Sequence, residues 1–159
     1  MSMFDHRRGG AALGALSHME IWEATLVMNL RLWCDGPNGQ SQVWNEYRRA
    51  MPPKVADKSL REFETLMRLL TECSHRALVR HDIACNCVGA DECIFLHLVR
   101  TASEGHLTDA ALISTLLIGA AHAERAAILA GEVGLASRTI ACAPRLAQTA
   151  QAGSAKTLH

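Results

Sequence analysis

Apolar residues recur every three or four positions along most of the chain, which is the spacing of one face of an α-helix. The longest such stripe comprises Leu60, Phe63, Met67, Leu70, Ser74, Ala77, His81 and Ala84. No stretch of useful length alternates between apolar and polar residues as a strand would. The pattern predicts an all-α protein, a bundle of four to five main helices. The short connections favour an up-and-down arrangement.

Capping signals place the first three helices. Ser17 and Glu20 have the spacing of a capping box, so we expect the first helix to begin at Ser17 and to stop at the Gly- and Pro-containing run 35–39. A second helix is expected over residues 41–51, ended by two prolines at 52–53. Ser59 and Glu62 form a second capping box, behind which a long third helix continues to about residue 84.

Two further helices complete the predicted bundle. The fourth begins near residues 89–91 and ends before Gly105, a typical C-terminal cap. The fifth begins at Thr108 or Asp109 and closes at Gly134. It is apolar most of the way round, which favours a central position. We therefore expect a flexible N-terminal arm at 1–16, the helical domain at 17–135 and a frayed tail at 136–159.

The net charge of the chain bears on which classes of molecule it binds. Of the 159 residues, Lys and Arg together number 16, as do Asp and Glu, so the formal net charge is zero. Nucleic acids and membrane surfaces are bound largely through excess positive charge, and neither is expected as a partner. No apolar run is long enough for a membrane span. Apolar surface left on the second or fifth helix would support a homo-oligomer or contact with another protein.

The six cysteines indicate the redox compartment. Disulfide-rich scaffolds are usually small, loop-rich and secreted, whereas this sequence is helical and carries no clear export signal. We expect reduced thiols in the cytoplasm.

The hinge between the third and fourth helices carries the strongest chemical signal. His81 and Cys85 are four residues apart, as are Cys93 and His97, so each pair would share one face of a helix. Thiolate and imidazole are the ligands of structural zinc. We predict His81, Cys85, Cys93 and His97 as a zinc site, with Cys87 as a substitute ligand.

Other interpretations of these residues stay open. Reduced cysteine is a common core residue, and His81 continues an apolar stripe. Cys85 and Cys87 could instead perform thiol redox chemistry. A carboxylate-bridged metal pair needs two ExxH motifs, and only the one from Glu72 to His75 is present.

The sequence contains no phosphate-binding loop, nucleophile elbow or HExxH motif. The function it favours is that of a small helical interaction or regulatory domain with a structural metal at the hinge. The alternative is a small enzyme or redox sensor that uses a metal or a reactive thiol in the bundle.

Overall fold

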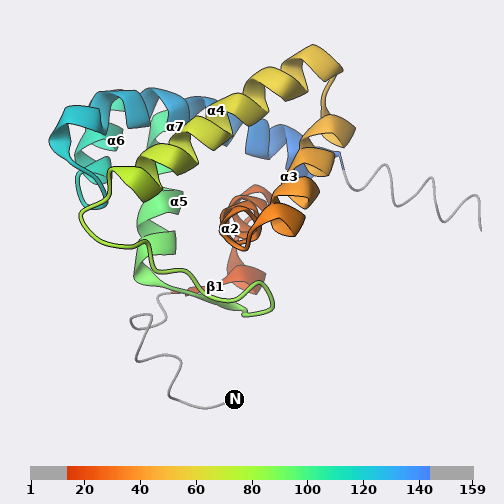
Figure 1. Ribbon diagram of the computed structural model, residues 1–159, viewed down its shortest axis with the longest axis horizontal. Coiled ribbons are helices and arrows are strands. Elements are labelled where there is room, and N and C mark those ends of the chain that lie inside the picture. Colours follow the sequence, from red (N-terminus) through yellow and green to blue (C-terminus); the bar gives the residue numbers. More distant parts are fainter. Residues whose placement is uncertain (1–13, 144–159) are drawn as a thin grey trace, which may run out of the picture.

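A computed structural model describes residues 14–143 (Figure 1). These residues form six α-helices, which are α2 (Ile21–Cys34), α3 (Pro37–Ala50), α4 (Pro53–Glu72), α5 (Ala90–Ser103), α6 (Leu107–Ser114) and α7 (Ala123–Cys142). The described part also contains two short 3-10 helices, η1 (Leu16–His18) and η2 (Ala120–His122). Its two strands have two residues each, β1 (Gly14–Ala15) and β2 (Cys87–Val88). The all-α class is confirmed, with six α-helices in the described part where four to five were expected.

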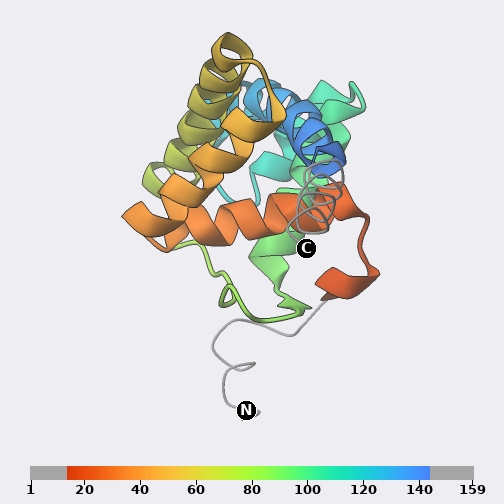
Figure 2. The same cartoon turned by 90° about the vertical axis from the view of Figure 1, so that its right-hand side faces the viewer.

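Helix α7 is the centre of the bundle. It packs against α2, α4, α5 and α6, and its buried side is made almost wholly of small residues such as Ala126, Ala127 and Ala130. Helix α2 is seen end-on in Figure 1 and side-on in Figure 2, whereas α5 runs upright in both. These two helices therefore cross steeply, a departure from an up-and-down order. None of the described helices has both the length and the apolar character needed to span a bilayer.

Gly134 serves close helix packing and does not cap a helix. A Cβ atom at this position would lie 2.6 Å from Cβ of Ser103 on α5. The expected end of the last helix at Gly134 is therefore wrong, and α7 continues to Cys142 with Ile140 and Ala141 buried. The start of the expected tail at residue 136 is corrected accordingly. The last three residues of the expected arm, 14–16, form β1 and the start of η1, and the rest of the expected arm and tail, 1–13 and 144–159, lies outside the described part.

Prolines begin helices in this fold. Pro37 and Pro53 each occupy the first turn of their helix, where a missing N–H and a fixed φ angle fit the geometry. The helices α2 and α3 do end before the two proline-containing runs, as expected, but the expected starts of the next helices at residues 41 and 59 are wrong for this reason. Both expected capping boxes are wrong as well, because Ser17 lies in η1 ahead of α2 and Ser59 lies inside α4.

Both long predicted helices are interrupted where they meet each other. Helix α4 ends at Glu72 instead of near residue 84, and the predicted fifth helix is divided into α6 and α7. The backbone N–H of His75 donates to Leu117 O at 3.1 Å, and that of Gly119 donates to Cys73 O at 3.3 Å. These tertiary hydrogen bonds replace the helical ones, so the backbone groups remain satisfied although the helices stop.

Candidate functional site

The connection between α4 and α5 is the most unusual part of the fold. Residues 73–89, which we call the thiol loop, contain little regular structure beyond β2 (Figure 1). The loop carries His81, Cys85 and Cys87, and side chains from α2 and α5 hold it in place. It was expected to be the end of a helix, so its conformation is the largest departure from the sequence prediction.

Arg31 of α2 fixes the backbone of the thiol loop. Its side chain is fully buried, and its guanidinium donates to three loop carbonyls: Asp82 O at 3.1 Å, Cys85 O at 2.6 Å and Cys87 O at 2.7 Å. The same group binds Glu92 of α5 through two bonds, 2.7 Å from Nε and 3.0 Å from Nη2. Arg31 therefore ties α2, α5 and the thiol loop together at one buried point.

Glu92 accepts hydrogen bonds from the backbone of the thiol loop as well as from Arg31. Its carboxylate, also fully buried, accepts the backbone N–H groups of His81 and Gly89, each at 3.0 Å. Burial alone would raise the pKa of Glu92. The hydrogen bonds from Arg31, Gly89 and His81 outweigh burial and hold the pKa of this carboxyl below its usual value. Glu92 is thus ionised at neutral pH and neutralises Arg31.

A second ion pair fixes the beginning of the loop. Asp91, only 1% exposed at its side chain, accepts two 2.7 Å hydrogen bonds from the guanidinium of Arg76 and one of 2.8 Å from the N–H of Val79. Burial would raise the pKa of Asp91, but the bonds from Arg76 and Val79 lower it overall. Adjacent carboxylates at the start of α5 therefore hold the thiol loop, Asp91 in its first half and Glu92 at its middle and its end.

The thiols and the imidazole lie on the part of the loop that Arg31 holds. Nδ1 of His81 lies 3.6 Å from Sγ of Cys85, and Nε2 of His81 is buried with no hydrogen-bond partner in the described part. All six cysteines are free thiols. Cys142 is exposed, and the other five, including Cys85 and Cys87, are half-buried. A small reagent can therefore reach the Cys85–Cys87 pair.

The two thiols of the loop interact with each other. Partial burial, a hydrogen bond with Cys85 and the negative charge of the Cys85 thiolate all raise the pKa of Cys87, and the Arg31 guanidinium counteracts them only in part. Burial likewise raises the pKa of Cys93, with Glu92 as a second cause, and burial is also the main cause at Cys34. Cys87, Cys93 and Cys34 are therefore protonated at neutral pH.

The structure brings together half of the predicted zinc ligands. His81 and Cys85 are adjacent, although in a loop and not on a shared helical face. Cys93 and His97 follow on α5, with Cys93 half-buried and His97 exposed. Within residues 14–143, no three His, Cys, Asp or Glu side chains are grouped closely enough to hold a metal ion. The four-ligand zinc site stays a prediction.

The residues of the predicted ExxH motif are separated by the end of α4. Glu72 is the last residue of the helix, and a ring nitrogen of His75 lies 3.1 Å from Thr115 O, away from any helix face shared with Glu72. His75 therefore helps to fix the break between α6 and α7, which is a structural role.

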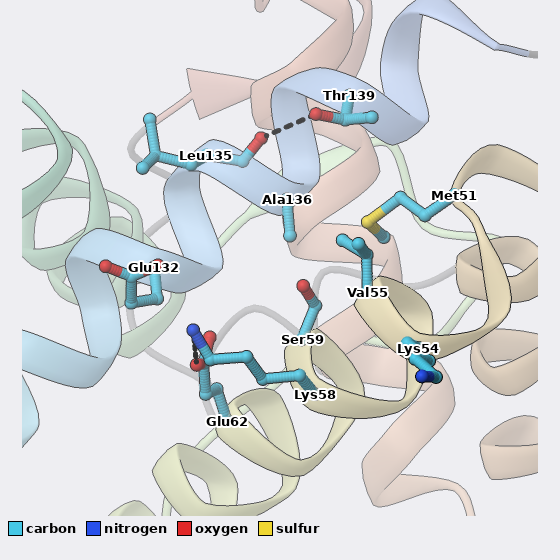
Figure 3. A pocket seen from close by; sticks show the side chains of 10 residues that line it. All are labelled: Met51, Lys54, Val55, Lys58, Ser59, Glu62, Glu132, Leu135, Ala136 and Thr139. Carbon is cyan, nitrogen blue, oxygen red and sulfur yellow. Dashed lines mark hydrogen bonds and ion pairs between the residues drawn. The ribbon is translucent and has the colours of Figure 1, made fainter.

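A groove lies between α4 and α7, away from the thiol loop (Figure 3). Its volume is about 460 Å³ and its apolar lining includes Met51, Val55 and Leu135. Val55 and Leu135 are 49% and 53% exposed, whereas small-molecule sites enclose most of their ligand. Lys58 on its rim pairs with Glu62 at 3.6 Å, so the rim carries both signs of charge.

Comparison with known proteins identifies no relative: no protein-family model, curated protein or solved structure matches this chain. The functional argument therefore rests on the geometry of the thiol loop.

Sequence reasoning missed Arg31 as the organising residue. It stands in the apolar stretch Leu26–Trp33, and a charged residue buried there requires a partner. The sequence therefore indicates that Arg31 has a buried partner, but it does not show that this partner is Glu92 or that three loop carbonyls accept from Arg31.

Proposed function

We propose that this protein is a small helical regulatory domain whose sensing element is the Cys85–Cys87 pair, which is oxidised reversibly to an intramolecular disulfide. One observation carries the proposal: a fully buried arginine donates hydrogen bonds to the carbonyls of both cysteines. Isolating an arginine from water is unfavourable by roughly several kcal/mol unless its charge and its N–H donors are fully paired. Such an arrangement fixes backbone geometry around a chemically active pair.

The reaction partner is a low-molecular-weight disulfide, RSSR. The Cys85 thiolate, beside His81, attacks one sulfur of RSSR and expels one RS⁻, which leaves a mixed disulfide on Cys85. Cys87 then loses its proton to solvent and attacks Sγ of Cys85, and the second RS⁻ departs. Two protein thiols are oxidised and one RSSR is reduced to two RSH. The two thiol protons are balanced by the two departing thiolates.

The raised pKa of Cys87 assigns the two thiols different roles. The raised pKa of Cys87 makes this thiol harder to ionise, whereas Cys85 has an imidazole nitrogen 3.6 Å away that can accept its proton. Cys85 is therefore the attacking thiol and Cys87 the resolving thiol. In a reducing cytoplasm, where we place the protein, such disulfides are transient and serve as signals.

The test uses the full-length protein equilibrated with mixtures of reduced and oxidised glutathione. Intact mass and peptide mapping should show the loss of two hydrogen atoms from the peptide that contains both Cys85 and Cys87, reversed by added reductant. The Cys34→Ser/Cys93→Ser variant should behave as wild type. The Cys87→Ser variant should stop at a mixed disulfide on Cys85.

Two results would overturn the proposal. One is oxidation that occurs first at other cysteines or between chains. The other is about one zinc per chain by elemental analysis of the same sample, with the loop thiols protected until chelation, which would favour the predicted four-ligand site instead.

A further inference from the structure

The residue between the two cysteines anchors the beginning of the described chain. Asn86 O accepts the N–H of Leu16 at 2.8 Å, Asn86 Oδ1 accepts the N–H of Ser17 at 3.1 Å, and Asn86 Nδ2 donates to Ser17 Oγ at 3.2 Å. The antiparallel pairing of β1 with β2 continues this contact, with Ala15 opposite Cys87 and Gly14 opposite Val88. Asn86 and Cys87 therefore carry most of the polar contacts that hold residues 14–17.

Closing a disulfide around Asn86 requires the backbone to bend there. Cα atoms two residues apart in an extended strand are separated by about 6.6–6.8 Å, at the upper end of the roughly 4.4–6.8 Å found in disulfides. The Cβ atoms must also approach to about 3.5–4.5 Å. Cys87 is in the paired strand β2, and the carbonyl of Asn86 accepts the N–H of Leu16, so ring closure has to bend the chain where its pairing with residues 15 and 16 begins. Asn86 is the one residue inside the ring, and both its carbonyl and its side chain must turn.

We infer that oxidation of Cys85 and Cys87 releases residues 14–18 from the thiol loop. This inference rests on the proposed function and adds its structural output. Turning Asn86 breaks the three hydrogen bonds to Leu16 and Ser17 and separates β1 from β2.

The release has a defined limit along the chain. Trp22 is buried in the main core, and its indole N–H donates to Glu20 at 2.7 Å, so α2 stays in place from its first turn. Leu16 also lines a groove over α2 together with Met28 and Leu32. Its departure removes one apolar wall of this groove, so the thiol chemistry changes the apolar surface next to α2.

The experiment is amide hydrogen exchange on the full-length protein in its reduced and oxidised forms, with intact mass measured on the same samples. We expect the amides of Leu16 and Ser17 to exchange faster by about tenfold or more in the oxidised form, the scale of losing one or two ordinary hydrogen bonds. Amides in the middle of α7 serve as the internal control and should not change.

An Asn86→Ala variant separates side-chain from backbone effects. In the reduced form it should speed exchange at Ser17, which loses the Oδ1 acceptor, and leave Leu16 protected by the carbonyl of residue 86. Oxidation should then speed exchange at Leu16 as well. A disulfide with unchanged exchange at Leu16 and Ser17 would overturn the inference and leave the proposed function standing. Absence of the disulfide in the mass spectrum would overturn the proposed function itself.

Discussion

Replacing Arg31 by methionine tests whether the buried ion pair organises the thiol loop. The substitution keeps an unbranched apolar side chain and removes the guanidinium. It leaves the fully buried Glu92 without its charged partner, and the carbonyls of Asp82, Cys85 and Cys87 without their donor. Glu92 would retain only the N–H groups of His81 and Gly89.

The magnitude follows from the burial of both partners. Breaking a buried ion pair by removing one member costs about 3–5 kcal/mol, because the other charge stays uncompensated. The loop carbonyls are partly accessible, so water can replace part of what they lose. Against a typical stability of about 5–15 kcal/mol, the variant should lose a large fraction of its free energy of unfolding. The midpoint of thermal unfolding should fall by roughly 10–20 °C for a domain of this size.

Urea denaturation followed by circular dichroism measures the loss. Arg68→Met is the matched control, because Arg68 pairs with Glu64 at 3.6 Å with both side chains about half exposed, and such pairs contribute about 1 kcal/mol or less. The Arg31→Met/Glu92→Met double variant should be less destabilised than the sum of the single variants, since no buried charge remains. An Arg31→Met loss no larger than that of Arg68→Met would refute the reasoning.

Three further predictions concern packing, acid and thiol reactivity. Gly39→Ala should destabilise the protein by about 2–3 kcal/mol in the same urea assay, because the added Cβ would lie 1.9 Å from Leu32 O; Gly119→Ala, with nothing within 4 Å, should be nearly neutral. Since the folded-state pKa values of Asp91 and Glu92 are depressed, the stability they contribute is present above the ordinary values of 3.8 and 4.5 and is lost as pH falls through the folded-state values. Denaturation midpoints between pH 3 and pH 6 should show this loss, and Glu92→Gln should weaken it; an equally steep fall in that variant would assign the acid sensitivity elsewhere. Cys34 and Cys93 should react with iodoacetamide at a higher pH in the folded protein than in urea, because burial raises their pKa, and coinciding pH profiles would contradict this.

The helical class was predictable because apolar spacing reports which side of a helix is buried, and that signal is local in the sequence. The start of α5 was predictable for the same reason, since Gly89, Asp91 and Glu92 act within one helical turn. The end of α4 was not. The stripe continues through Ser74, Ala77 and His81, and contacts with residues outside the stripe, among them Leu117, Gly119 and Glu92, divert the backbone from a helix.

In the candidate site, too, the features that depend on local sequence were predictable and those that depend on distant residues were not. His81, Cys85 and Cys87 were singled out from their chemistry and spacing, and the contact between His81 and Cys85 exists although the helix expected to produce it does not. Arg31 lies 61 positions from Glu92, and no local pattern connects them. No local pattern points to Asn86, because its partners Leu16 and Ser17 lie 69 or more positions away in a segment predicted to be an arm or a helix start.

In the proposed function, Arg31 fixes the backbone around the reduced Cys85–Cys87 pair through its hydrogen bonds to both carbonyls. The measurement that tests this most directly is the reduction potential of the pair in the wild type and in Arg31→Lys. Lysine keeps a charge opposite Glu92 but cannot reach three carbonyls and a carboxylate at once. If the hydrogen bonds to Cys85 O and Cys87 O favour the reduced form, their loss should make the potential more negative by about 30–60 mV, since 30 mV corresponds to about 1.4 kcal/mol for this couple. An unchanged potential in a folded Arg31→Lys protein would contradict the account.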